Sequence, residues 1–163
     1  MEATLIHLEP ITAENYRECT SLKVANTQAH LVASNAKSLA EAYVFYASSR
    51  PYAIYCDDTM VGFLLLRELE HLQSYYLSQF MIDEHHQRKG YGKQAMLVLI
   101  ESLKEEKKYS QIDLCFLDGD EGAKNLYEGL GFVSTGEVEA NEIIMRLCLT
   151  PLPPTIWSVA TIL

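Results

Sequence analysis

Cysteine is scarce in this sequence, and its four copies are widely and irregularly spaced, at Cys19, Cys56, Cys115 and Cys148. Because no C-x-x-C pair occurs, the sequence indicates neither a zinc site nor a redox motif, and we expect no bound metal. Cys56 and Cys115 lie in apolar, strand-like runs, which predicts that both are buried thiols.

Long apolar runs are also missing. No stretch is long and apolar enough to cross a bilayer, and the N-terminus lacks the basic-then-apolar pattern of a signal peptide. We therefore expect no membrane partner, and the cytoplasm is the default compartment.

Basic residues are outnumbered, since 13 Lys and Arg face 22 Asp and Glu, which gives a formal net charge of -9. General nucleic-acid binding is not expected, because neutralising phosphates requires a surplus of cations. An acidic protein suits cationic small molecules instead, although solubility is the more common reason for such a charge.

The length and the order of elements indicate one domain. A chain of 163 residues buries roughly two thirds of its unfolded surface. Helical patterns alternate with several hairpins and at least one β-α-β step, which predicts a single α/β domain with a mixed sheet over residues 1–149. Residues 150–163 form a tail with prolines and an apolar end. The sequence leaves open whether this tail packs on the domain, packs on a neighbouring subunit or is disordered.

Turn and cap residues mark the expected elements. Strands at 52–55 and 61–66 flank the polar turn 57–59, which predicts a hairpin. Thr12 is the expected N-cap of a first helix, and Ser38 with Glu41 matches a capping box that would begin another. Pro10 and Pro51 are expected to interrupt regular structure. Further strands are predicted at 4–8, 75–82, 111–116, 132–134 and 143–149, and further helices within 25–36, after Gly92 and after Asp120.

The stretch 78–101 joins an apolar strand end to a glycine-punctuated basic turn and a long helix. Such a junction suits phosphate, because loop N–H groups converge there and the helix dipole presents partial positive charge. Glycine lets the backbone approach a diphosphate, and cationic side chains add charge-assisted contacts. The alternative is an ordinary turn with a solvated basic rim. The candidate phosphate-binding residues are Gln87, Arg88, Lys89, Gly90, Tyr91, Gly92 and Lys93.

Two signatures carry a family resemblance. Gln87-x-x-Gly90-x-Gly92 resembles the acyl-coenzyme-A loop of the GCN5-related N-acetyltransferase (GNAT) superfamily, and 123–132 resembles its A-x-x-L-Y-x-x-x-G-F segment. The resemblance covers roughly residues 4–149 and is greatest to bacterial spermine/spermidine (diamine) N-acetyltransferases. It implies a mostly antiparallel mixed sheet, flanked by helices and splayed at the acetyl-CoA site, and an acetyl-CoA co-substrate.

The resemblance also implies roles for individual residues. Backbone groups of Phe80, Met81 and Ile82 would contact the pantetheine arm, one N–H polarising the thioester carbonyl. Tyr127 would protonate the departing thiolate; the alternative is a packed aromatic residue. Asp120 stands where the family often has Asn in contact with the coenzyme, so it is either a coenzyme contact or a helix N-cap. Arg88 stands where the family commonly has a small residue.

The residues that bind and deprotonate the acetyl-accepting amine are less clearly indicated by the sequence. A primary amine must lose a proton before it attacks, and Glu84 is the first candidate for the base, followed by Asp83 and Glu70. The resemblance implies an acceptor wall containing Gln28 and Glu41, with acidic side chains binding the distal amines of a polyamine. Those acidic candidates are Glu41, Glu84, Glu137 and Glu139.

Three alternatives stay open at this point. The amine substrate is a polyamine such as spermidine or spermine, or another amine such as an aminoglycoside, an amino acid or a protein N-terminus. A third possibility is an inactive module that binds acetyl-CoA and regulates a partner. Members of the family often dimerise, so a homodimer is a further expectation.

Overall fold

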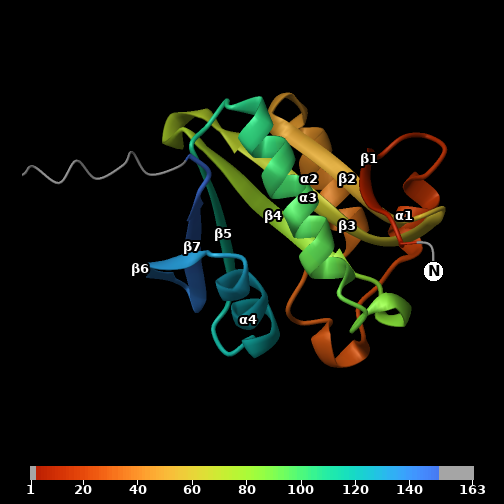
Figure 1. Cartoon of the computed structure of the whole chain (residues 1–163). Coiled ribbons are helices and arrows are strands. Elements are labelled where there is room, and N and C mark those ends of the chain that lie inside the picture. Colours follow the sequence, from red (N-terminus) through yellow and green to blue (C-terminus); the bar gives the residue numbers. More distant parts are fainter. Residues whose placement is uncertain (1–2, 151–163) are drawn as a thin grey trace, which may run out of the picture.

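One seven-stranded sheet forms the frame of the protein (Figure 1). The computed structural model describes residues 3–150. The strand order is β1-β2-β3-β4-β5-β7-β6, and every neighbouring pair is antiparallel except β4 and β5, which are parallel. The strands are β1 (Ile6–Pro10), β2 (Ser49–Cys56), β3 (Thr59–Leu69), β4 (Ser74–Ile82), β5 (Gln111–Leu117), β6 (Val133–Glu139) and β7 (Glu142–Cys148).

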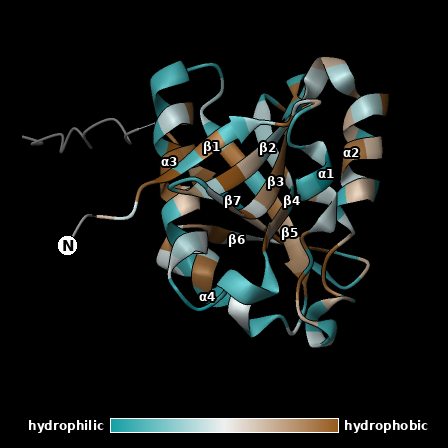
Figure 2. Cartoon of the chain, turned by 90° about the vertical axis from the view of Figure 1, so that its right-hand side faces the viewer, coloured by the Kyte–Doolittle hydropathy of each residue, from teal (hydrophilic) through white to brown (hydrophobic). Residues whose placement is uncertain are grey.

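Helices cover both faces of this sheet (Figures 1 and 2). The helix α3 packs against β1 and β4, whereas α1 and α2 pack against β2 and β3 on the opposite face. The α-helices are α1 (Tyr16–Ser21), α2 (Asn35–Val44), α3 (Tyr91–Glu106) and α4 (Glu121–Gly129). Short 3-10 turns are η1 (Asn26–Gln28), η2 (Tyr46–Ser48), η3 (Glu70–Leu72) and η4 (Glu84–His86). Among residues 3–150, no helix has the length and apolar character required to cross a bilayer.

The sheet separates two apolar clusters. Strand β3 is buried on both faces, because its alternate side chains enter different clusters. Leu64 and Leu66 join the larger cluster beneath α3 and α4, and Phe63 and Leu65 join the smaller cluster beneath α1 and α2. The predicted single mixed α/β domain is confirmed, including the hairpin between β2 and β3.

The predicted boundaries of helices and strands are wrong at two helix caps and at one proline. Ser38 is buried inside α2 and does not begin it; Ser34 is the N-cap, and its side chain accepts from the Lys37 N–H at 3.2 Å. The first regular helix begins at Tyr16, with Asn15 and not Thr12 at the cap position. Pro10 is the last residue of β1, so the strand stops at this proline as predicted. Pro51, in contrast, lies inside β2 and does not interrupt it. Its carbonyl accepts from the Ile11 N–H at 3.2 Å, just beyond the end of β1. The N–H that proline lacks would point to the same side, where β1 has already ended, so the sheet loses no hydrogen bond there.

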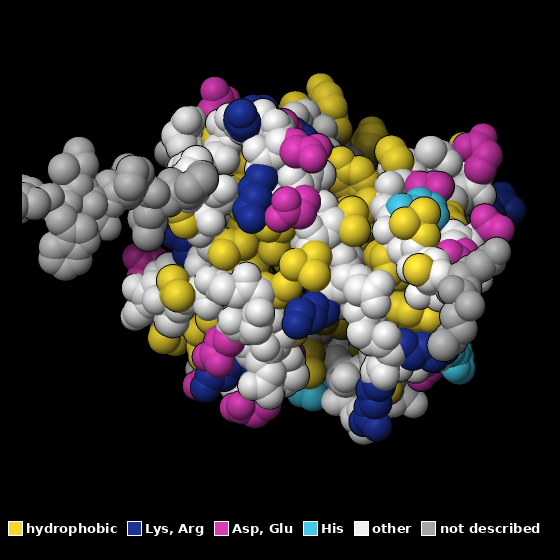
Figure 3. Space-filling model, viewed as in Figure 1, with side chains coloured by type: hydrophobic (Ala, Val, Ile, Leu, Met, Phe, Trp, Pro, Cys, Tyr) yellow, Lys and Arg dark blue, Asp and Glu magenta, His cyan; other side chains and the backbone are white. Residues whose placement is uncertain are grey.

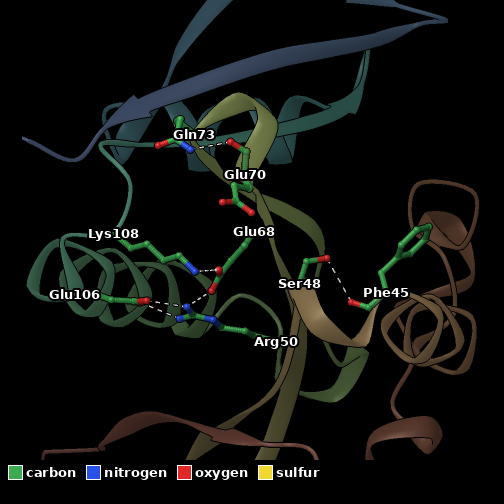
Figure 4. Close-up of polar contacts among 8 residues, drawn as sticks. All are labelled: Phe45, Ser48, Arg50, Glu68, Glu70, Gln73, Glu106 and Lys108. Carbon is green, nitrogen blue, oxygen red and sulfur yellow. Dashed lines mark hydrogen bonds and ion pairs between the residues drawn. The ribbon is translucent and has the colours of Figure 1, made fainter.

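An ionic network ties β2 and β3 to α3 (Figure 4). The Arg50 guanidinium donates two hydrogen bonds to the Glu106 carboxylate, at 2.7 and 2.8 Å. Arg50 also pairs with Glu68 on β3, and Glu68 pairs in turn with Lys108. The neighbouring carboxylates raise the pKa of Arg50, with the Glu106 hydrogen bond as the largest cause, so the guanidinium stays charged.

Candidate active site

The sheet opens between β4 and β5. These strands pair only where residues Tyr75 to Leu77 face Ile112 to Leu114. A bulge follows at once: Leu66 pairs with Leu77 and Leu65 pairs with Gln79, which leaves Ser78 without a partner on β3. The remaining halves of β4 and β5 diverge, which confirms the splayed sheet.

A cavity of about 300 Å³ occupies this opening, and we call it the cleft. Its wall is built from β4, β5, the start of β7, α4 and the segment that precedes α2. A second cavity of about 160 Å³ shares part of the wall and extends toward Gln28 and Gln87. The cleft is lined by Leu31, Val32, Ala33, Leu77, Ser78, Gln79, Phe80, Cys115, Phe116, Leu117, Asp120, Ala123, Leu126, Tyr127 and Glu142.

The backbone of β4 presents hydrogen-bonding groups to this opening. The Asp83 N–H donates to the Val61 carbonyl at 2.8 Å, so it points toward β3. Because successive residues of a strand point their amides to opposite sides, the N–H groups of Phe80 and Ile82 point away from β3, where pairing with β5 has ended. The Ile82 carbonyl points the same way and accepts from the Gln87 side-chain amide at 2.9 Å.

The glycine-punctuated turn leads into the N-terminus of α3 near the end of β4. Gly90 caps α3 with a left-handed φ of 80° and no side-chain bond, so no cap side chain occupies the first N–H groups of this helix. Arg88 is exposed and also left-handed, with φ of 62°, a conformation that glycine adopts more readily than a residue with a side chain. Lys89 and Lys93 are exposed as well. On this face, cationic side chains are dispersed among acidic ones (Figure 3).

Gln28 lies at this end of the site. The Gln87 amide donates to the Gln28 side-chain oxygen at 2.9 Å, and both residues line the second cavity. The sequence placed Gln28 on the acceptor wall, whereas the structure places it beside the loop predicted to bind phosphate.

Tyr127 extends from α4 into the cleft. Its ring packs between Phe116 and Phe132, with centroid distances of 6.0 and 5.6 Å. Burial raises the pKa of the phenol, and the nearby Asp120 and Cys115 raise it further, so the hydroxyl stays protonated at neutral pH. Asp120 caps α4 by accepting from the Ala123 N–H at 3.0 Å, as one of its two predicted roles required.

One glutamate, Glu142, lines the cleft, and a second, Glu41, hydrogen-bonds to a residue of its lining. Glu41 on α2 accepts from the Ser78 hydroxyl at 3.0 Å and pairs with Arg67 at 3.4 Å. Glu142 lines the cleft from β7 and accepts from the Cys115 thiol at 3.3 Å. Cys115 is therefore half-buried, not buried as the sequence suggested, because it faces the space where β4 and β5 separate.

The other predicted acids lie elsewhere. Glu84 is in η4, outside the lining of both cavities, with its carboxylate 3.6 Å from His85 Nε2. Asp83 is buried and accepts from the N–H groups of Lys23 and His85, at 3.0 and 3.2 Å. Glu70 lies in η3, at the opposite end of β4 from the cleft. Glu137 and Glu139 are exposed on β6.

Glu142 and Tyr76 were missed at the sequence level. The turn at Ala140 and Asn141, both with positive φ, was foreseen and fixes where β7 begins. The pairing that sets Glu142 opposite Leu117 joins residues distant in the chain, and no local pattern signals it. Among residues 3–150, no group of three or more His, Cys, Asp or Glu side chains is arranged to hold a metal ion.

Comparison with known proteins assigns the chain to a family. Residues 14–132 match the Acetyltransferase (GNAT) family. The chain belongs to this family. As a GNAT protein it is an acetyl-CoA-dependent N-acetyltransferase, and the cleft suits that co-substrate: two β4 amides face it, and the uncapped N-terminus of α3 lies at its end.

Relatives within the family act on different amines, as their names indicate. A spermine/spermidine N(1)-acetyltransferase of Bacillus subtilis (strain 168) is 28% identical over 142 residues, covering 83% of this chain and 93% of that protein. The solved spermidine N-acetyltransferase from Vibrio cholerae, in complex with CoA and spermine, is 17% identical with a TM-score of 0.71, covering 88% and 95% of the two chains. The ribosomal-protein-S18-alanine N-acetyltransferase from Escherichia coli is 18% identical with a TM-score of 0.70, covering 94% and 99%.

Proposed function

We propose that this GNAT protein transfers the acetyl group of acetyl-CoA to a primary amine of a polyamine, such as spermidine or spermine, by direct attack within a ternary complex. The observation that carries this proposal is a pair of carboxylates at the cleft: Glu142 lines it, and Glu41 accepts a hydrogen bond from the lining residue Ser78. A polyamine carries several positive charges, and two separated carboxylates can bind one distal ammonium and the reacting amine. The names of the 28% identical relatives support the same substrate class.

The chain supplies three kinds of contact to the acetyl donor, which itself supplies an activated acetyl group. The N–H groups of Phe80 and Ile82 face the cleft and are placed to stabilise negative charge on a carbonyl oxygen. Met81 stays a prediction as a cofactor contact, because its side chain is buried on the other face and its carbonyl points toward Gly62 on β3. The turn from Gln87 through Gly92, with Lys93, holds the diphosphate at the start of α3.

Tyr127 is the proposed general acid. Its phenol is protonated, lines the cleft and is held by Phe116 and Phe132, so it can donate a proton to a departing thiolate. Asp120 caps the helix that carries Tyr127 and faces both cavities, where it orients α4 beside the coenzyme.

Glu84 stays a prediction for the base and for acceptor binding. Its position outside the cavity lining makes it a weaker candidate than Glu142, which lines the cleft. The cytoplasmic location and the homodimer likewise stay predictions; light scattering at several protein concentrations measures the oligomeric state.

A panel of amines tests the function. Acetylation is followed by release of the CoA thiol, with spermidine, spermine, simple monoamines, an aminoglycoside, amino acids and a short peptide with a free N-terminus. We expect spermidine or spermine to give the highest kcat/KM. Preference for the peptide would instead favour a protein N-terminus, the substrate class named for the Escherichia coli neighbour. Binding of CoA without turnover of any amine would indicate an inactive regulatory module.

A further inference from the structure

Three side chains form a hydrogen-bonded chain across the splayed part of the sheet. The Tyr76 hydroxyl lies 2.9 Å from Cys115 Sγ, and the Cys115 thiol donates to Glu142 Oε2 at 3.3 Å. The three residues come from β4, β5 and β7, which are neighbours in the sheet. Cys115 and Glu142 line the cleft, and Tyr76 precedes the cleft residues Leu77 and Ser78.

This chain lies close to the proposed reaction centre. Cys115, Glu142 and the proposed acid Tyr127 all line the same cleft. The acceptor amine must approach the same point, because it attacks the carbonyl bonded to the sulfur that Tyr127 protonates. Tyr76 is half-buried and lies two residues before the cleft residue Ser78 on β4.

The hydrogen bonds have a defined direction. Since the Cys115 thiol donates to the carboxylate, the Tyr76 hydroxyl donates to the sulfur, and the lone pairs of its oxygen remain free to accept. Burial raises the pKa of Tyr76 and of Cys115, so both groups keep their protons at neutral pH. The chain thus runs from an acceptor oxygen, through two transferable protons, to an anionic end.

We propose that Tyr76, Cys115 and Glu142 form the proton relay that deprotonates the acceptor ammonium, a role that rests on the proposed function. One N–H bond of the ammonium breaks as its proton binds Tyr76 Oη. The Tyr76 proton passes to Cys115 Sγ, and the Cys115 proton passes to the Glu142 carboxylate. The amine regains its lone pair, one proton has moved, and no electron is transferred. Glu142 then releases the proton to solvent.

Other charged and titratable groups face this relay and must be separated from it. Glu41 is the main rival as a base, but its carboxylate already accepts from Ser78 and pairs with Arg67. The other charged or titratable groups around the relay are Glu41 from α2, Arg67 from β3, Asp113 from β5, Glu139 from β6 and Tyr127 from α4.

Kinetics over pH test the relay directly. At neutral pH we expect Glu142→Gln and Cys115→Ala each to lower kcat/KM for spermidine roughly a hundredfold. Cys115→Ser retains a hydroxyl that can pass a proton, so it should recover most of the lost activity. The defect of Glu142→Gln should shrink as pH rises, and it should be smaller with a less basic amine, because more of the acceptor is already neutral. Glu105→Gln, an exposed acid on α3 with no proposed role, is the matched control and should behave as wild type.

A second readout needs no acetyl-CoA. In a Cys148→Ser background, the rate at which iodoacetamide alkylates Cys115 is measured against pH by mass spectrometry. Glu142 raises the pKa of Cys115, so Glu142→Gln should shift that titration to lower pH while CoA affinity, measured by calorimetry, stays unchanged.

The outcomes separate the relay from the function. If the wild type acetylates spermidine but Glu142→Gln and Cys115→Ala keep its pH profile, the relay is wrong and the proposed function stands. An unshifted Cys115 titration would also overturn the relay, since the groups would not be coupled. If the wild type acetylates no amine, the proposed function fails and the relay fails with it.

Discussion

The two ends of the β4–β5 pair differ in how their backbones are satisfied. At the start of β4, residues Tyr75 to Leu77 pair with β5, and the Arg50 network ties the neighbouring strands to α3 (Figure 4). At the other end the strands diverge, and the amides of Phe80 and Ile82 face a cleft. The paired end adjoins the larger cavity, about 780 Å³ against about 300 Å³ for the cleft. We propose that the end with unpaired backbone and a protonated Tyr127 is the reactive one, although its cavity is the smaller of the two.

The bulge at Ser78 accounts for the difference. Before it, Tyr75 and Leu77 point into the core beneath α3; after it, Phe80 and Ile82 do so. The extra residue shifts the alternation of side chains by one position, so that even-numbered residues face this core after the bulge. The bulge also bends β4 where it separates from β5. The hydroxyl of Ser78, the extra residue of the bulge, donates to Glu41.

Tyr127→Phe should give the largest effect on activity. Loss of the phenolic proton is expected to lower kcat roughly a hundredfold, while CoA binds with unchanged affinity in calorimetry. Tyr109→Phe is the control at the paired end, where Tyr109 packs edge-on against Tyr75 with centroids 5.0 Å apart. Full activity of Tyr127→Phe, under conditions where chemistry limits the rate, would contradict its role as the acid.

Gly62→Ala should destabilise the fold and disturb the cleft. A Cβ at Gly62 would lie 2.4 Å from the Met81 carbonyl oxygen, so β3 and β4 must move apart at the end of β4 that carries the reactive amides. We expect a loss of about 2 kcal/mol in the free energy of unfolding, measured with urea. Gly129→Ala, where nothing lies within 4 Å of the added Cβ, should change it by less than about 1 kcal/mol. Equal effects in the two variants would refute close packing as the cause.

Arg50→Gln probes the paired end. The side chains of Arg50 and Glu106 are 29% and 32% exposed, so solvent screening limits the expected loss to about 1 kcal/mol. Arg50 lowers the pKa of Glu106, first through their hydrogen bond, so this stabilisation is present above the ordinary Glu value of about 4.3 and is lost as pH falls below it. The stability gap between wild type and variant should therefore close in acid, with kcat nearly unchanged. A gap that widens in acid would reverse the assigned linkage.

Arg88→Gly should have the smallest effect. Glycine tolerates the left-handed φ of 62° at this position, so the free energy of unfolding should rise by about 0.5 kcal/mol. Lys89→Gly removes a neighbouring cation where φ is not left-handed, and it should destabilise the protein slightly. A tenfold loss of CoA affinity in Arg88→Gly alone would show that this guanidinium binds phosphate.

Local patterns predicted much of the fold and one side of the site. The Gly90-x-Gly92 turn and the Tyr127 segment each combine helix and turn signals within a few residues, so their elements could be placed. The contact of Glu41 with the cleft residue Ser78 could not be predicted, because the N-cap of α2 is Ser34 and not Ser38, so Glu41 has no part in a capping box. Glu142, Tyr76 and Cys115 meet through pairing across three strands, and such long-range register leaves no mark in any one segment.

We propose that the cofactor site lies at the splayed end of β4 and not in the larger cavity. Titration of ¹⁵N-labelled protein with CoA, followed by amide NMR shifts, tests it directly. We predict that the largest shifts occur at Phe80, Ile82, Gly90 and Gly92, with little change at Tyr109 and Leu149, which line the larger cavity. Shifts concentrated at Lys107 to Ser110 and at Leu149, with Phe80 and Ile82 unmoved, would contradict the account.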